Sequence, residues 1–214
     1  MAVRAVLWDM DGTLVDSEEY HWLSWRDTMA LEGVPLSYDD FVATFGWRND
    51  AILPRWLGTG ATPSEIVRIG DAKEALYRDM VRAGGLVPLP GAAEWVTRLR
   101  EQGWRQSIAS SAPRANVLAV LEVLGMTFDA VVAAEDVIYG KPAPDVFLAA
   151  ARKLDAEPAN SIVVEDADAG VAGGRAAGCR TIGISRNGKA QAADLVVGGL
   201  DELPLDAFDT LLSR

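Results

Sequence analysis

Four short polar clusters in this 214-residue sequence carry the groups that could do chemistry, and each comes after a short apolar run. Their residues are Asp9, Asp11, Ser110, Ser111, Lys141, Glu165 and Asp166. Carboxylates that share a site repel one another, and a divalent cation relieves the repulsion. Oxygen ligands without histidine or thiolate suit Mg²⁺. A site of carboxylates, Mg²⁺ and one lysine suits a phosphate group, whose charge needs cations on several sides.

The scarcity of histidine and cysteine narrows the chemistry further. His21 is the only histidine and Cys179 is the only cysteine. These counts exclude a zinc site built on several histidines, an intramolecular disulfide and a thiolate metal cluster. The chemistry must therefore run mostly on carboxylates, lysine, arginine and hydroxyl groups, with His21 as the one histidine able to act as a general base. Cys179 is expected to be an inert packing residue.

Asp9 and Asp11 have the spacing for two complementary roles. Residues two apart lie on the same side of an extended segment. One carboxylate could attack phosphorus while the other handles protons, and Ser110 could donate a hydrogen bond to a phosphoryl oxygen. The D-x-D-G pattern also resembles a Ca²⁺ loop. That loop has glycine at its sixth position and Glu at its twelfth, however, where this chain has glycine at the fourth and Tyr20 at the twelfth.

The apolar runs themselves predict the fold. Short runs rich in strand formers alternate with stretches of helical spacing, as in 107–109 followed by 116–124. This alternation indicates an α/β fold, a doubly wound parallel sheet covered by helices on both faces. In an open parallel sheet, ligands bind outside the carboxyl ends of the strands. We therefore expect the four polar clusters to converge on one edge of the sheet.

Residues 17–87 break this alternation. They read as helices throughout, and their prolines mark helix boundaries or loops. A step at 88–91 that contains proline and glycine then leads back to the strand pattern. We predict an α/β catalytic core of residues 1–16 and 88–214, with residues 17–87 inserted after the first strand as a helical cap.

The composition limits the partners. Thirty-one acidic against twenty basic side chains give a net charge of −11, which disfavours binding to nucleic acid or to an acidic membrane surface. No apolar run approaches the roughly 20 residues that span a bilayer, and the N-terminus shows no secretory signal. We expect a cytoplasmic protein, a monomer, whose partner is a small phosphorylated molecule.

The four clusters resemble, in order and spacing, the four motifs of the haloacid dehalogenase superfamily. The matching residues are Asp9-Met10-Asp11-Gly12-Thr13, Ser110, Lys141-Pro142 and Glu165-Asp166. The resemblance covers essentially the whole chain. It is strongest to members with a helical cap after the first strand, the sugar-phosphate phosphatases and beta-phosphoglucomutase. Asp11 speaks against a dehalogenase, since those members lack an acid at this position.

The resemblance implies a role for each residue of the catalytic set. Asp9 is the nucleophile that becomes an aspartyl-phosphate, and Asp11 protonates the leaving group and then activates the incoming hydroxyl. Ser110 and Lys141 hold the phosphoryl group. The implied Mg²⁺ ligands are Asp9, Asp11 through its backbone carbonyl, Asp166 and, in support, Glu165.

The cap sharpens the resemblance. The stretch 16–25 is similar to the first hinge and cap helix of beta-phosphoglucomutase, and 47–50 is similar to the segment whose arginine grips the distal phosphate of its substrate. Lys73, four residues before Tyr77, falls where that enzyme has another phosphate-facing lysine. The substrate-binding set that we expect is Gly12, Thr13, His21, Trp47, Arg48, Lys73, Ser111 and Arg114.

One departure bears on the reaction. After the second predicted strand, beta-phosphoglucomutase has Ser-Lys-Asn around its non-transferring phosphate, where this chain has Ala112-Pro113-Arg114. The change weakens the second phosphate site that a mutase requires, although Arg114 could replace part of the charge. We expect a Mg²⁺-dependent phosphatase of a small phosphorylated metabolite, a sugar or polyol phosphate, with a beta-phosphoglucomutase-type mutase as the alternative. A third hypothesis is a phosphoacceptor signalling domain, which would need neither a cap nor Asp11 as an acid.

Overall fold

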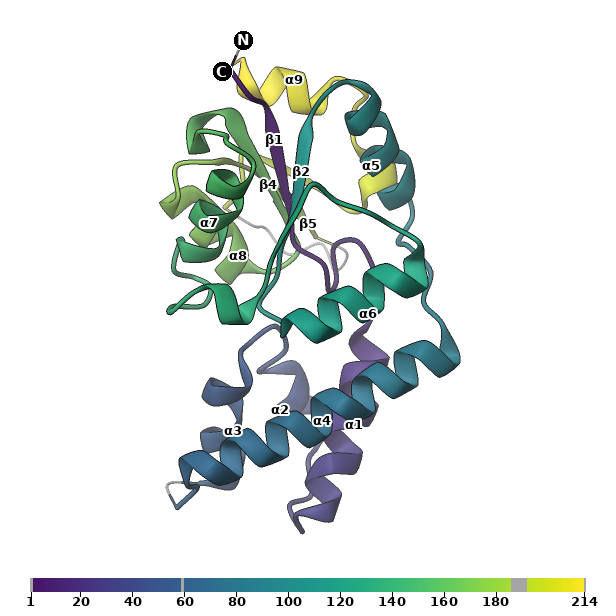
Figure 1. Ribbon diagram of the computed structural model, residues 1–214, viewed down its shortest axis with the longest axis vertical. Coiled ribbons are helices and arrows are strands. Elements are labelled where there is room, and N and C mark those ends of the chain that lie inside the picture. Colours follow the sequence, from purple (N-terminus) through teal and green to yellow (C-terminus); the bar gives the residue numbers. More distant parts are fainter. Residues whose placement is uncertain (1, 59, 186–191, 214) are drawn as a thin grey trace.

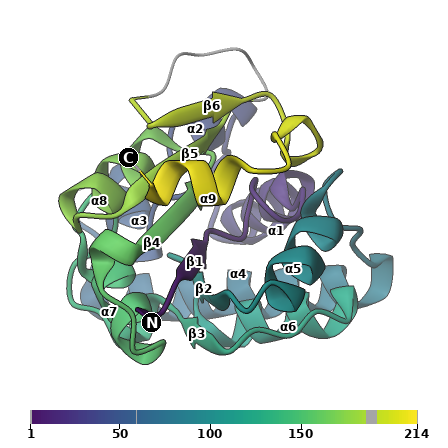
Figure 2. The ribbon, with the colours of Figure 1, turned by 90° about the horizontal axis from the view of Figure 1, so that it is seen from above.

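Six parallel strands form one sheet in the computed structural model, which describes residues 2–58, 60–185 and 192–213. The strands are β1 (Ala5–Trp8), β2 (Arg105–Ala109), β3 (Ala130–Val132), β4 (Ser161–Glu165), β5 (Arg180–Ile184) and β6 (Leu195–Val197). Figure 1 shows β1, β2, β4 and β5 from the side, and Figure 2 shows the order across the sheet, β3-β2-β1-β4-β5-β6. The prediction of a doubly wound parallel sheet is confirmed.

Side chains of each central strand alternate between the two faces of the sheet, because successive residues of a strand point to opposite sides. In β1, Val6 and Trp8 belong to one buried cluster, and Ala5 and Leu7 belong to another. All four are fully buried. Both faces of this strand are therefore covered, as the continuous apolar run in its sequence predicts.

Helices supply the cover on both faces. The first buried cluster takes side chains from α5 (Ala92–Glu101), α6 (Arg114–Leu124) and α9 (Ala207–Leu212). The opposite face carries α7 (Asp145–Lys153) and α8 (Asp168–Ala176), which lie together on one side of the sheet (Figure 2). Short 3-10 helices occupy Ala134–Asp136, Pro158–Asn160 and Leu200–Glu202.

Four helices follow β1 and precede α5: α1 (Glu18–Leu31), α2 (Tyr38–Val42), α3 (Asn49–Leu57) and α4 (Pro63–Gly84). They lie beyond the end of the sheet at which β1 stops (Figure 1) and bury an apolar cluster of their own. The longest, α4, starts with a capping box between Thr62 and Glu65, which satisfies two N–H groups that the helix start leaves unpaired. We call α1–α4 the cap. The expected division of the chain at residues 17 and 87 stays a prediction.

The two connections between cap and core lie side by side. Val15 and Pro88 form an antiparallel bridge, and the Leu89 N–H donates to the Leu14 carbonyl at 2.8 Å. On the other side of the cap, α4 packs along α6 of the core (Figure 1). The cap therefore meets the core through packed helices as well as through its two connections. Among the described helices, none is both long enough and apolar enough to cross a membrane.

Gly91, where the chain returns from the cap into α5, generates a stability prediction. Its φ is +82°, which costs an L side chain roughly 1–2 kcal/mol, and a Cβ there would overlap backbone atoms of Leu200 and Asp201. We expect Gly91→Ala to lower the free energy of unfolding by about 3 kcal/mol in a denaturant titration. Gly103→Ala is the control, because Gly103 has a φ of +78° and open space around it. Equal losses in the two variants would contradict the close approach.

Candidate active site

The polar groups that follow β1, β2 and β4 meet at the carboxyl edge of the sheet. Because β1 lies between β2 and β4, Asp9, Ser110 and Glu165 sit at the ends of neighbouring strands. The chain runs outward from β1 in both directions, which makes this edge the switch point where doubly wound sheets bind ligands. A cavity of about 600 Å³ opens here between the core and the cap. The catalytic and metal residues expected from the sequence all line it: Asp9, Asp11, Ser110, Lys141, Glu165 and Asp166.

Lys141 joins two buried carboxylates at this edge. Its Nζ donates to Asp9 Oδ1 and to Glu165 Oε1, each at 2.6 Å. Burial alone would lower the pKa of Lys141, but the charges of Asp9 and Glu165 outweigh burial and raise it. Burial and the charge of Glu165 hold the pKa of Asp9 well above its ordinary value, and Lys141 opposes them. The site therefore needs positive charge to keep Asp9 ionised.

Asp9, Glu165 and Asp166 form a group that fits a metal ion. Each offers a carboxylate oxygen, and these oxygens all lie within 4.8 Å of one another. An all-oxygen set at this spacing suits Mg²⁺ better than a metal that prefers histidine or thiolate. A divalent cation here would counter the repulsion that raises the pKa of Asp9. The Asp11 carboxylate is not part of this group, so an Asp11 ligand would have to be its backbone carbonyl.

Small residues leave room for the metal-binding carboxylates. A Cβ on Gly170 would overlap the carboxylate of Glu165, whose Oε2 also accepts from the Ala167 N–H at 2.9 Å. A Cβ on Gly12 would likewise overlap the carboxylate of Asp166. Thr13, which is fully buried, has its Oγ1 3.4 Å from Asp166 Oδ1. The structure thus places Gly12 and Thr13 behind the metal group, and neither lines the cavity.

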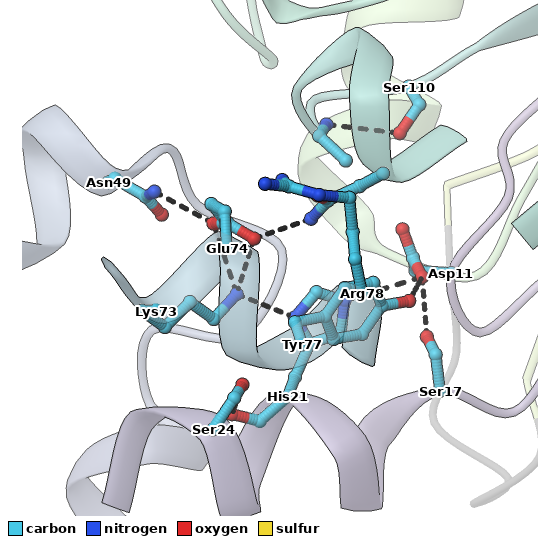
Figure 3. Close-up of polar contacts among 12 residues, drawn as sticks. Asp11, Ser17, His21, Ser24, Asn49, Lys73, Glu74, Tyr77, Arg78 and Ser110 are labelled. Carbon is cyan, nitrogen blue, oxygen red and sulfur yellow. Dashed lines mark hydrogen bonds and ion pairs between the residues drawn. The ribbon is translucent and has the colours of Figure 1, made fainter. Parts of the chain in front are cut away.

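Asp11 faces the cap and has a different environment from Asp9. Its Oδ1 accepts from Ser17 Oγ at 2.5 Å and lies 3.4 Å from His21 Nε2 and 3.5 Å from the Tyr77 hydroxyl (Figure 3). Burial raises the pKa of Asp11, but His21, Ser17 and Lys73 together outweigh burial and lower it. Two aspartates only two residues apart therefore have pKa values displaced in opposite directions.

His21 and Lys73 stand together behind Asp11. Lys73 Nζ lies 2.9 Å from His21 Nδ1, and the His21 ring stacks on Tyr77 with 4.1 Å between centroids. Lys73 is only 1% exposed. Burial lowers its pKa, and the charge of the adjacent Glu74 opposes this. Both residues line the cavity as expected, but the Lys73 ammonium is directed at His21 and Glu74.

The other expected substrate residues are divided between the cavity and the surface. Ser111, Trp47 and Arg48 line the cavity. Arg48 Nη1 donates to the Ala134 carbonyl at 3.2 Å, which joins the cap to the core, and its Nη2 pairs with Asp50 at 3.4 Å. Trp47 is half exposed at the rim. The cavity wall also includes Ser110, whose Oγ accepts from the Ala112 N–H at 3.0 Å.

Like Gly12 and Thr13, Arg114 was expected to bind substrate and does not line the cavity. Its guanidinium pairs with Asp136, and its backbone N–H donates to the Glu135 carboxylate. Both acids belong to the 3-10 helix that follows β3. Local attraction to Asp136 turns the arginine away, so the charge that it was expected to lend to a second phosphate site is not at the cavity wall.

Several polar residues of the site escaped the sequence analysis. Ser17 and Tyr77 contact Asp11, and Asn49 donates to Glu74 beside Lys73 (Figure 3). Asn116 also donates to Glu74. The sequence held one signal for Tyr77, since Lys73 and Tyr77 are four apart and so share a helix face. No spacing rule links Glu74 to Asn116, because they lie on helices that meet only in the folded chain.

The site belongs to a chain that resembles known phosphate-handling proteins. The model of the haloacid dehalogenase-like hydrolase family matches residues 3–178. Protein CbbY of Rhodobacter capsulatus is 34% identical over 85% of both chains. Hexitol phosphatase B of Escherichia coli K12 is 33% identical over 84% of this chain and 82% of its own. The crystal structure of beta-phosphoglucomutase from Clostridium difficile, 24% identical, superposes with a TM-score of 0.89 over 99% of this chain and 100% of its own.

The grouping of Asp9, Glu165 and Asp166 predicts where a metal binds. We expect Asp166→Asn to weaken Mg²⁺ binding at least about tenfold in titration calorimetry, because one of three anionic ligands is lost. Asp168→Asn is the control, since it removes the same charge two residues later and Asp168 lies outside the group. If the two variants lost affinity for Mg²⁺ equally, the negative charge of the region, and not ligation by Asp166, would explain Mg²⁺ binding.

Proposed function

Because this chain belongs to the haloacid dehalogenase-like hydrolase family, we propose that it is a Mg²⁺-dependent phosphatase that hydrolyses a small phosphorylated metabolite, a sugar or polyol phosphate. One observation carries the proposal: Asp9 and Asp11 line one cavity in opposite environments. Asp9 contacts Lys141 at the sheet edge, and Asp11 contacts Ser17 and His21 on the cap side. Such a pair supplies a nucleophile and a separate proton carrier.

The first half of the reaction transfers the phosphoryl group to Asp9. An oxygen of Asp9 attacks phosphorus, a P–O bond forms, and the bond from phosphorus to the leaving oxygen breaks. Asp11 gives a proton to that oxygen, which departs as an alcohol. Before substrate binds, its lowered pKa keeps Asp11 ionised. The charge of an incoming phosphate raises this pKa, so proton uptake accompanies binding.

The second half returns the enzyme to its starting state. Water attacks phosphorus, its proton passes to Asp11, and the bond between phosphorus and Asp9 breaks to release inorganic phosphate. Ser110 and Lys141 bind the phosphoryl oxygens in both halves. Asp9, Glu165 and Asp166 would hold Mg²⁺, which when bound supplies positive charge beside the reacting phosphate.

The cap covers the reaction and selects the leaving group. Aromatic rings of Trp25, Phe41 and Phe45 line the cavity on the cap side, along with Arg48 and His21. Closure over the substrate excludes bulk water, which strengthens every charge interaction inside. The hexitol phosphatase among the relatives supports a polyol or sugar phosphate as the substrate.

A phosphomutase is the second candidate, because beta-phosphoglucomutase shares the fold. In a mutase a second hydroxyl of the substrate accepts the phosphoryl group, so the non-transferring phosphate needs its own cations. The loop after β2 offers few cationic side chains for this second phosphate. Ala112 and Pro113 line the cavity without charge, while Arg114 pairs with Asp136 outside it. This loop favours water as the acceptor.

The two candidates predict different products. With glucose 1-phosphate and Mg²⁺ we expect release of inorganic phosphate to outpace formation of glucose 6-phosphate, and we expect a screen of sugar and polyol phosphates to find faster substrates. Conversion to glucose 6-phosphate that outpaces phosphate release would favour the mutase. Repeated turnover of an aryl phosphate would exclude a phosphoacceptor signalling domain, because such a domain keeps its phosphoryl group and does not release phosphate in rapid turnovers.

Removal of the proton carrier tests the role of Asp11. Asp11→Asn keeps the shape of the side chain and removes its acid. We expect kcat for the best sugar phosphate to fall by about 10²–10⁴, the contribution typical of general acid–base catalysis, with an unchanged melting temperature. Near-wild-type turnover in this variant would mean that Asp11 does not carry the proton.

A further inference from the structure

Glu74 is a buried acid of the cavity that the proposed reaction does not use. It lies on α4, is 5% exposed and lines the cavity. Its Oε1 accepts from Asn49 Nδ2 at 2.8 Å, and both oxygens accept from Lys73 Nζ at 3.1 Å (Figure 3). Its Oε2 also accepts from Asn116 Nδ2. A buried carboxylate is costly unless it is paired and hydrogen-bonded. These contacts hold Glu74 in one orientation.

The contact with Lys73 extends to Asp11 through His21. An ammonium group only donates hydrogen bonds, so His21 Nδ1, 2.9 Å from Lys73 Nζ, must be the acceptor. Neutral His21 therefore carries its proton on Nε2, which faces Asp11 Oδ1 at 3.4 Å. The rings of Trp25 and Tyr77 lie 5.0 and 5.2 Å from the ammonium and confine it further. Glu74 thus lies at the far end of a chain of contacts that ends on Asp11.

The contact with Asn116 connects this series of side-chain contacts to the core. Asn116 is fully buried on α6, and its Oδ1 accepts from Arg78 Nη1 at 2.9 Å. Glu74 and Arg78 are four apart, so they share one face of α4. A carboxylate only accepts and a guanidinium only donates, which fixes the orientation of the amide between them. One core side chain therefore contacts two charged groups of α4, Glu74 and Arg78.

We propose that Glu74 is a positioning residue for Asp11, an inference that rests on the proposed phosphatase reaction. Glu74 aims the Lys73 ammonium at His21, and His21 presents its Nε2 proton to Asp11. The hydrogen bond from Asn116 makes this alignment depend on α4 lying against α6.

Glu74→Gln tests this role through the leaving group. The glutamine keeps the shape but removes the charge that holds Lys73. For the best sugar phosphate, whose alkoxide needs a proton to leave, we expect kcat/KM to fall by at least about tenfold, part of the 10²–10⁴ that general acid catalysis supplies. For p-nitrophenyl phosphate, whose phenolate leaves without a proton, we expect a fall of less than about threefold. We compare kcat/KM because it reports the first phosphoryl transfer and not the later hydrolysis.

Asp71→Asn is the matched control, because it removes the same charge from the same helix and the same cavity wall. We expect it to leave the ratio of the two kcat/KM values unchanged. Equal losses on both esters in Glu74→Gln, no loss on either, or the same change of ratio in Asp71→Asn would overturn the proposal. If wild-type protein released phosphate from neither ester, the proposed function itself would be wrong.

A double variant keeps the test decisive if Glu74→Gln does not fold. Lys73→Met with Glu74→Gln removes both charges, so neither is left buried without a partner. It also breaks the link to His21. We expect the same selective loss on the sugar phosphate, and a folded double variant with a wild-type ratio would overturn the proposal.

Discussion

The ammonium of Lys141 between the carboxylates of Asp9 and Glu165 is the interaction on which the site depends. Parallel pairing places the ends of β1 and β4 side by side, with Trp8 opposite Val164, so the carboxylates that follow are forced together. Burial and mutual repulsion would protonate Asp9 and remove its nucleophilicity. The loop before α7 supplies Lys141, whose charge opposes both effects, and Gly170 leaves the space that Glu165 occupies.

A second consequence of the fold is that Asp9 and Asp11, two residues apart, have different environments. Asp9 stays with the sheet edge and its cations, whereas Asp11 contacts Ser17, His21 and Tyr77 from the cap. The cap therefore has a chemical role as well as a steric one, because it supplies the partners that set the pKa of Asp11. A cap directly after β1 is well placed for this, since its first helix starts at Glu18, only seven residues beyond Asp11.

Sequence reasoning found the parts of the site that strand topology brings together. Apolar runs predict the strands, and the polar clusters follow these runs directly. The carboxyl ends of parallel strands lie at one edge of the sheet, so the clusters must lie close together there. This is why the positions of Asp9, Ser110 and Glu165 were predictable. Contacts between the cap and the core were not, because they depend on how helices pack. Arg114 was expected at the substrate and pairs with Asp136 instead. Glu74 and Asn116 carried no signal, yet they bond across the two parts of the chain.

The central claim is that Asp9, kept ionised by its cations, attacks phosphorus. An acyl phosphate is reduced by borohydride, which converts the phosphorylated aspartate to homoserine. Quenching the enzyme with borohydride during turnover of its best substrate, followed by mass spectrometry of its peptides, tests the claim directly. We expect homoserine at position 9 only. Reduction at another carboxylate, or none during active turnover, would contradict it.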